Sequence, residues 1–266
     1  MYTKINEKLF GNDDKHWTQL DWIKKVSEHQ ILMLDSGQAV RPGDLPLNTT
    51  LEIAERAKEL HRLHPLVSQM RVRAGEDYVR YVRDVLEVRN PPRQHFQDYD
   101  LRLFEDIHEM YEQLMARNDE VGLGRLVAGY AWEWKSKSNK SAFDIQINGL
   151  NLRWNSTDKD WVNSGDPTQE VGSIHVIQGY DLNYAGVIIG NDLKFNPSLR
   201  QTIMERDNYF DKKGKENNAQ LGIQYTDEDL AVFVRNIYGV LLTRGILGTY
   251  VYVCDPALRE YLKEYF

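Results

Sequence analysis

Two stretches in the second half of the chain constrain the fold most, because each joins a polar turn to the kind of apolar run that forms a buried strand. In the first stretch, residues 170–190, the pattern of Ser173–Ile177 predicts a short strand, and Gly186–Ile189 is a second apolar run. Continuous runs of this kind are typical of parallel strands that are covered on both faces. The polar residues between the two runs are therefore expected at the end of a strand.

The second stretch, residues 240–255, predicts the end of a helix followed by a strand. The helix is expected to end at Thr243-Arg244, because Gly245 is a natural residue just beyond a helix end. Residues Thr249–Cys254 are β-branched and aromatic enough for a central strand. This arrangement places Arg244 at the rim of a sheet, where open α/β folds bind ligands.

Composition narrows the class of protein. A chain of 266 residues with 41% hydrophobic content can form one large domain or two small ones around a proper core. The net charge of -7 argues against a surface that is wholly a nucleic-acid footprint, although an acidic protein can still carry a local basic groove. The single cysteine, Cys254, can form no intrachain disulfide. Without a signal segment or an apolar run of about 18 residues, a soluble cytoplasmic protein with no membrane partner is expected.

Both stretches resemble motifs of superfamily-one helicases. His175–Asp181 is similar to the fifth motif of these enzymes, and Leu242-Thr-Arg-Gly245 is similar to the sixth, which carries an arginine finger. Over their full length, the sequences of both stretches are most similar to the Schlafen group 3-like DNA/RNA helicase domain of prokaryotic P-loop ATPases. The resemblance extends from about Thr18 to the end of the chain. The resemblance implies an α/β fold with a RecA-like second lobe, a mainly parallel sheet over residues 49–266, and a remnant of the first lobe in residues 1–48.

The resemblance also implies which residues face ATP. Superfamily-one enzymes close ATP between two lobes, so the second lobe has to bring positive charge to the phosphates. Arg244 corresponds to the finger, whose guanidinium forks onto two oxygens. Arg71 stands where the fourth motif places a phosphate-contacting arginine, and Gln38 where the third motif places a glutamine that senses the terminal phosphate. Each of these two assignments has an alternative. For Arg71 the alternative is a solvated basic face that it forms with Arg73, Arg80 and Arg83. For Gln38 it is an ordinary strand-exit turn.

Further residues are expected near the ribose or the nucleic acid. The fifth motif implies this position for Gln178, Gly179 and Asp181, whose structural alternatives are a surface amide, a turn glycine and a cap. The nucleic-acid side also includes the following residues: His175 in the fifth motif, Arg41 after the third motif in what is otherwise a Pro-Gly turn, and Trp132 and Lys135 after a strand. An aromatic ring beside a lysine can stack on a base while the lysine holds a phosphate, although core tryptophans beside a solvated loop explain the same pattern.

The chain departs from the family pattern in one respect that bears on activity. It contains no Gly-x-x-x-x-Gly-Lys-Ser/Thr phosphate loop and no apolar strand that ends in Asp-Glu before Ile31. The ATP-binding lysine and the magnesium carboxylates would lie upstream of Met1, so ATP and Mg are expected only with a P-loop lobe, and no hydrolysis is expected from this chain alone. His61 and His64 lack a third ligand, and no metal site is predicted.

Two functions follow. The first is the C-terminal half of a DNA/RNA helicase or translocase, which binds single-stranded nucleic acid and is completed by a P-loop lobe. The second is a catalytically inactive, truncated homologue that binds nucleic acid or a protein partner. The apolar strand predicted at Ile31–Asp35 would lack its neighbours, and such a strand invites pairing. Residues 1–48 are therefore expected to pack onto a second copy, onto a separately encoded first lobe or against their own C-terminal lobe.

Local patterns predict the remaining elements. The helices are Thr18–Val26, a helix from Thr49 or Thr50 to Leu63, Gly75–Leu86, Asp100–Asn118, and a last helix that Thr226 caps together with Asp229. The other segments are the strands Leu66–Gln69 and Leu126–Trp132, a hairpin insertion over Phe143–Trp154 with Asn148-Gly149 at its turn, a polar loop over Asn155–Thr168, and a mobile loop over Phe195–Gly222.

Overall fold

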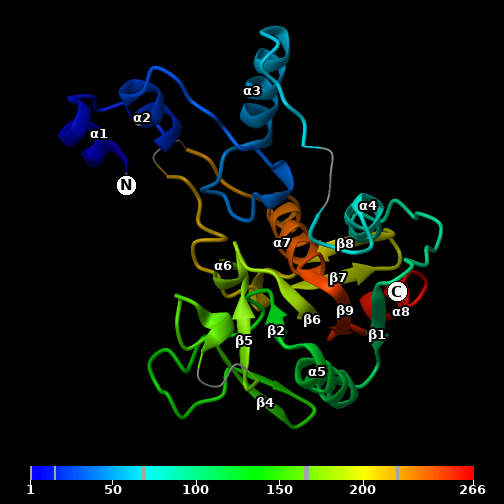
Figure 1. Cartoon of the computed structure of the whole chain (residues 1–266). Helices are drawn as coiled ribbons and strands as arrows, with labels where there is room; N and C mark the ends of the chain where they lie inside the picture. Colours follow the sequence, from blue (N-terminus) through cyan, green and yellow to red (C-terminus); the bar gives the residue numbers. More distant parts are fainter. Residues whose placement is uncertain (1, 15, 67–69, 165–167, 220–221) are drawn as a thin grey trace.

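A seven-stranded sheet forms the centre of the molecule in the computed structural model, which describes all residues except 1, 15, 67–69, 165–167 and 220–221 (Figure 1). The strand order is β1-β9-β6-β2-β5-β4-β3. The strands are β1 Asp100–Phe104, β2 Gly124–Ala128, β3 Ile145–Ile147, β4 Leu150–Trp154, β5 Glu170–Ser173, β6 Leu182–Ile189 and β9 Gly245–Val253. All neighbouring pairs are parallel except β3 with β4, so the predicted α/β class with a mainly parallel sheet is confirmed.

Helices cover both faces of the sheet. On one face lie α4 (Glu76–Leu86), α7 (Asp227–Leu242) and α8 (Pro256–Leu262), and on the other lies α5 (Ile107–Val121) (Figure 1). Successive side chains of a strand point to opposite faces. In β2, for example, Val127 packs in the core of the first face, while its neighbours on either side pack in the core under α5. Burial on both faces explains why the strands read as continuous apolar runs.

The N-terminal helices stand outside these layers. They are α1 (Tyr2–Phe10), α2 (Gln19–Val26) and α3 (Leu47–Glu59), and Figure 1 shows them beyond the rim of the sheet. Neither α2 nor α3 buries a residue. The prediction of α2 is confirmed, with Thr18 at its N-cap. The prediction that Thr49 or Thr50 caps α3 is wrong, because the helix begins directly after Pro46, whose fixed φ suits the residue before a helix.

Helix α7 forms as its sequence predicts. The hydroxyl of Thr226 accepts a hydrogen bond from the Asp229 backbone N–H at 3.2 Å, and the Asp229 carboxylate accepts one from the Thr226 N–H at 2.9 Å. This reciprocal pair satisfies two donors that the first turn of a helix leaves open. Leu230, Val234 and Ile237 then line the buried side of the helix. Asp227-Glu228-Asp229 is therefore a favourable helix start.

The predicted hairpin is confirmed. Asn148 and Gly149 have φ angles of 49° and 89°, the positive values that a type I′ turn requires. Strand β4 then pairs in parallel with β5, so the hairpin extends the main sheet. The loop that follows was predicted as polar, yet Trp161 lies fully buried in a short 3-10 helix, Trp161–Asn163.

Three predicted elements differ in type. The predicted helix Asp100–Asn118 is strand β1 followed by α5, and Asp106 caps that helix by accepting from the His108 N–H at 2.8 Å. The predicted strand over 173–177 is the end of β5 followed by the short helix α6 (Ile174–Ile177). The apolar run Ile31–Asp35 forms no strand, and Ile31 is 92% exposed.

Other boundaries move as well. The segment predicted as a mobile loop contains a second, antiparallel sheet of β7 (Leu193–Asn196) and β8 (Gln201–Met204), followed by the 3-10 helix Arg206–Asn208. Strand β2 ends at Ala128, four residues before the predicted end. The strand predicted over residues 66–69 falls mostly outside the described residues.

Candidate functional site

Residues of both helicase-like motifs meet at the amino-terminal edge of the sheet. Asp181 precedes β6 and Arg244 precedes β9, and the residues that follow them, Leu182 and Gly245, are register partners. The Leu182 N–H donates to the Arg244 carbonyl at 3.1 Å. The rim at which open α/β folds bind ligands is the carboxyl-terminal one. The prediction that Arg244 lies at that rim is therefore wrong, because it lies at the opposite edge.

Arg244 lies in the arginine loop, residues 242–245, which connects α7 to β9. The residue is only 4% exposed, and within the described part of the chain its Nε has no hydrogen-bond partner. Burial, together with the nearby charge of Arg71, lowers the pKa of the Arg244 guanidinium to about 10. The group is thus still charged at neutral pH. A buried charge without full compensation is costly, and such groups are typically found where a ligand completes the pairing.

Hydroxyl groups fix the backbone of the arginine loop. The Leu242 carbonyl accepts from the Tyr78 hydroxyl at 2.8 Å and from the Thr249 hydroxyl at 3.1 Å. Tyr99 donates to the Gly245 carbonyl at 3.2 Å and lies 2.7 Å from the Thr249 hydroxyl. These three hydroxyl-bearing side chains are buried. They hold the loop in one conformation, and no local sequence signal identifies them.

The last residue of the arginine loop, Gly245, leaves no room for a side chain. It was predicted to lie just beyond the helix end, but the helix ends at Leu242 and Gly245 already begins β9, with a φ that is not among the positive values. A Cβ at this position would lie 2.0 Å from the Gly248 carbonyl oxygen. The tight turn therefore requires glycine for space.

Arg71 lies beside the arginine loop. Its guanidinium forms an ion pair with Asp181, so Asp181 acts as a partner of an arginine and does not cap a helix. The N–H of Arg73 donates to the Ile246 carbonyl at 3.0 Å, which ties this segment to the start of β9. Arg80, from the basic face proposed as an alternative, pairs with Asp77 in solvent.

A cavity of about 100 Å³ opens between α4, α7 and the short 3-10 helix Ser36–Gln38. Four guanidinium groups and two carboxylates are among its lining groups: Arg71, Arg83, Arg235, Arg244, Asp35 and Glu87. Gln38 also lines it, so three residues that the resemblance assigned to ATP, Gln38, Arg71 and Arg244, are brought together here. With more cations than anions, the cavity suits a ligand that carries negative charge.

The remaining residues predicted near the ribose lie outside this lining. Gln178 is exposed, and Gly179 has a φ of 91° in the turn between α6 and β6, which agrees with its alternative as a turn glycine. Arg41, which was predicted on the nucleic-acid side, is paired with Asp44 at 3.3 Å in an exposed turn. These positions carry no geometric argument for a phosphate contact.

An aromatic cluster lies at the carboxyl-terminal edge, beyond the ends of β2 and β5. Tyr130 lies between Trp154 and His175, with ring centroids 5.3 Å and 5.7 Å away. Trp134 packs on Trp154 at 6.3 Å, and the ammonium group of Lys137 lies 5.5 Å from the Trp134 ring centre. Further members are Trp132, half-buried beside Trp154, and Lys135, which is exposed. His175 also contacts the Asp211 carboxylate at 3.5 Å.

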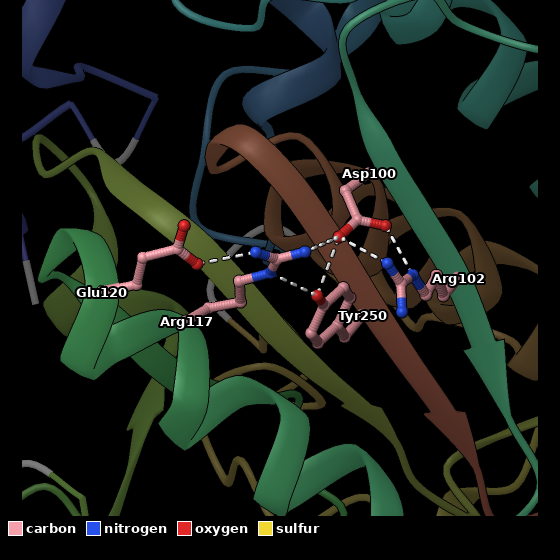
Figure 2. A network of polar contacts seen from close by, with 5 residues as sticks. All are labelled: Asp100, Arg102, Arg117, Glu120 and Tyr250. Carbon is pink, nitrogen blue, oxygen red and sulfur yellow. Dashed lines mark hydrogen bonds and ion pairs between the residues drawn. The ribbon is translucent and has the colours of Figure 1, made fainter.

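A second group of charges belongs to the scaffold. Figure 2 shows Asp100, Arg102, Arg117, Glu120 and Tyr250, which join β1, β9 and α5. The Asp100 carboxylate accepts from the Tyr250 hydroxyl at 2.8 Å and from Arg102 Nε at 2.6 Å, and Arg117 pairs with Glu120 at 2.7 Å. Two arginines face two carboxylates here, so this network is neutralised internally, unlike the lining of the cavity.

Metal ligands and membrane-spanning helices were also sought. Among the described residues, no group of three or more His, Cys, Asp or Glu side chains is arranged to hold a metal ion. None of the described helices combines the length and the apolar character that crossing a bilayer requires.

The parallel sheet, the helices on both faces and the arginines at the amino edge define a RecA-like α/β lobe. The chain belongs to the family described as Schlafen group 3, DNA/RNA helicase domain, whose model matches residues 4–255. It is also 31% identical over 171 residues to the uncharacterized protein YPL245W of Saccharomyces cerevisiae, a match that covers 62% of this chain and 37% of the yeast protein. No solved structure matches the chain significantly.

Proposed function

We propose that this chain acts as the second RecA-like lobe of a superfamily-one DNA/RNA helicase or translocase. In this role it supplies Arg244 to the terminal phosphate of ATP held on a P-loop lobe. The observation that carries the proposal is the cavity lined by Gln38, Arg71 and Arg244, in which a buried guanidinium has an Nε without a hydrogen-bond partner among the described residues.

The arrangement supports a division of roles among these side chains. A phosphoryl group in transfer spreads negative charge over its oxygens, and an inserted arginine stabilises that charge. Arg244 is held by a fixed loop, so its position costs little reorganisation when the ligand arrives. Asp181 orients Arg71 through their ion pair, and Gln38 contributes an amide at the cavity wall. The P-loop lobe would supply the phosphate-binding lysine and the magnesium ion.

Single-stranded nucleic acid is proposed to bind at the other edge of the sheet. The aromatic cluster at that edge combines half-buried rings with exposed ammonium groups. The rings are those of Trp132 and Trp134, and the ammonium groups are those of Lys135 and Lys137. Rings of this kind stack on bases of any sequence, and the lysines contact phosphates. His175 borders the same cluster through Tyr130.

The test of the phosphate role is a reconstituted ATPase assay. The chain is mixed with a separately expressed P-loop lobe of this family, and hydrolysis is measured with saturating single-stranded nucleic acid. We expect Arg244→Ala to lower the rate about a thousandfold or more, Arg244→Lys to restore little of it, and Arg80→Ala to leave it unchanged. Arg80 is a matched control because its side chain pairs with Asp77 in solvent. Full activity of Arg244→Ala in an active mixture would refute the assignment.

One sequence fact favours a second candidate function. The chain contains no phosphate loop, which is also expected of a catalytically inactive module that binds nucleic acid or a protein. The two candidates differ in the same assay, since an inactive module gives no hydrolysis with any P-loop lobe of the family but still binds its partner. A salt series of single-strand binding then distinguishes nucleic acid from protein as that partner, because phosphate contacts weaken as salt rises.

A further inference from the structure

A short lid covers the arginine cavity. The lid is residues 35–38, and its Asp35 carboxylate lies 3.5 Å from Arg83 Nη2 while accepting from the Gly37 N–H and the Gln38 amide, both at 2.9 Å. A Cβ at Gly37 would lie 2.0 Å from Arg83 Nη2. The lid backbone therefore rests directly on the Arg83 guanidinium.

The lid is anchored at one end only. On its C-terminal side, Val40 is buried, and the Asn236 amide on α7 donates to the Ala39 carbonyl at 2.8 Å. On its N-terminal side, Ile31 and Met33 are 92% and 74% exposed. A segment held in this way can swing about its anchored end with few packing contacts to break.

The ion pair under the lid is a weak one. Both side chains, Asp35 and Arg83, are nearly half exposed, and a charge pair at 3.5 Å in such surroundings contributes little. A phosphate group offers an arginine more oxygens and more charge than a carboxylate does. Phosphate oxygens can thus replace Asp35 at the guanidinium.

We propose that Arg83 is a further phosphate-binding residue of this cavity and that the Asp35 carboxylate masks it until a polyphosphate takes the place of that carboxylate, with Gln38 remaining at the cavity wall. The proposal rests on the proposed function, because it concerns the same cavity. It adds a residue that the helicase motifs do not include, and it makes the Asp35 carboxylate a competitor of the ligand. The chain alone then binds a polyphosphate weakly, and removing the lid carboxylate tightens that binding.

The test is isothermal titration of the full chain with inorganic tripolyphosphate at low ionic strength. Asp35→Asn should tighten binding about fivefold, the change expected when a half-exposed ion pair no longer competes. Arg83→Gln introduced into the Asp35→Asn chain should reverse this gain, whereas Arg80→Gln, on the exposed side of α4, should not. Glu55→Gln, on the exposed face of α3, controls for the change in net charge. Thermal unfolding verifies that each variant is folded.

The outcomes separate this inference from the proposed function. If Asp35→Asn binds tripolyphosphate no more tightly than Glu55→Gln does, or if Arg83→Gln leaves the gain in place, the masking role is wrong. That result leaves the effect of Arg244→Ala on reconstituted hydrolysis untouched. Conversely, the expected changes in tripolyphosphate binding together with an ATPase that tolerates Arg244→Ala would support the lid and refute the arginine finger.

Discussion

Two hydroxyl groups donate hydrogen bonds to the carbonyl of Leu242, two residues before Arg244. Substitutions that remove one hydroxyl at a time therefore test how the arginine loop is held. The Leu242 carbonyl accepts from the Tyr78 hydroxyl at 2.8 Å and from the Thr249 hydroxyl at 3.1 Å, and both donors are fully buried. Tyr78→Phe and Thr249→Val each remove one hydroxyl and keep the shape of the side chain. Because either donor alone still satisfies the carbonyl, the double variant should behave differently from the sum of the single variants.

The magnitudes follow from the cost of an unpaired buried acceptor. Tyr78→Phe loses one buried hydrogen bond, which lowers the free energy of unfolding by about 1 kcal/mol. Thr249→Val loses two, to the Leu242 carbonyl and to the Tyr99 hydroxyl, which lowers it by about 2 kcal/mol. The double variant also leaves the Leu242 carbonyl without a side-chain donor, and this adds about 1–3 kcal/mol beyond the sum. For a chain of this size, each kcal/mol corresponds to a fall of roughly 2–4 °C in the melting temperature.

Urea unfolding of the four chains, wild type, two singles and the double, measures this coupling. A matched control is Tyr261→Phe, which removes a buried hydroxyl that donates to the Val85 carbonyl at 2.8 Å. Combined with Thr249→Val, it should show additive effects. If Tyr78→Phe and Thr249→Val are also additive within about 0.5 kcal/mol, the two hydroxyls do not share the Leu242 carbonyl, and our account of the loop is wrong.

Three further predictions concern other parts of the molecule. Burial raises the pKa of the Asp192 carboxyl from 3.8 to about 7, so between these pH values the native state retains a proton that the unfolded chain releases. The free energy of unfolding should therefore fall as pH rises through this range. Urea unfolding at several pH values measures this fall, and Asp192→Asn should flatten it. A Cβ at Gly172 would lie 2.4 Å from Trp161 Cζ3, so Gly172→Ala should cost about 1–3 kcal/mol in the same assay. In filter binding over a salt series, Trp134→Ala should weaken single-strand binding by about 1–3 kcal/mol without changing the slope of log affinity against log salt, whereas Lys135→Gln should reduce the slope by about 0.7.

Elements with complete local signals could be predicted from the sequence. The capping pair Thr226 and Asp229 with an apolar stripe after it defines α7, and Asn148-Gly149 between two alternating segments defines the hairpin. Both depend on contacts within a few residues, which a sequence pattern records directly. That β4 joins β5 depends on residues further along the chain, so the local pattern could not predict that the hairpin extends the main sheet.

Other elements were missed because two patterns overlap. Leu101 and Phe104 fall at the spacing of the apolar face of α5, so strand and helix read as one helix. Asp106 is of a residue type that commonly caps helices, and it marks the true start of α5. The apolar run at Ile31–Asp35 failed for another reason: a strand needs a neighbour, and the described residues provide none.

The cavity itself could not be predicted, because its lining comes from four separate segments. The resemblance supplied Arg71 and Arg244, but it gave no sign that Asp181 pairs with Arg71 or that Arg235 faces the same space. Only the register of β6 against β9 brings the residues before those strands together. Parallel pairing of this kind joins distant segments, and no local pattern contains it.

The segment between β5 and β6 has a special position with respect to both candidate sites. Parallel strands require each connection to return from the carboxyl-terminal edge to the amino-terminal edge of the sheet. The connection after Ser173 includes His175, at the aromatic cluster, and ends with Asp181, which holds Arg71 at the arginine cavity. It is therefore a short covalent path between the surface proposed for nucleic acid and the cavity proposed for phosphate. If the proposed function holds, a nucleic acid that shifts α6 would change the Asp181 ion pair within the same segment, so that binding at one edge would alter hydrolysis at the other.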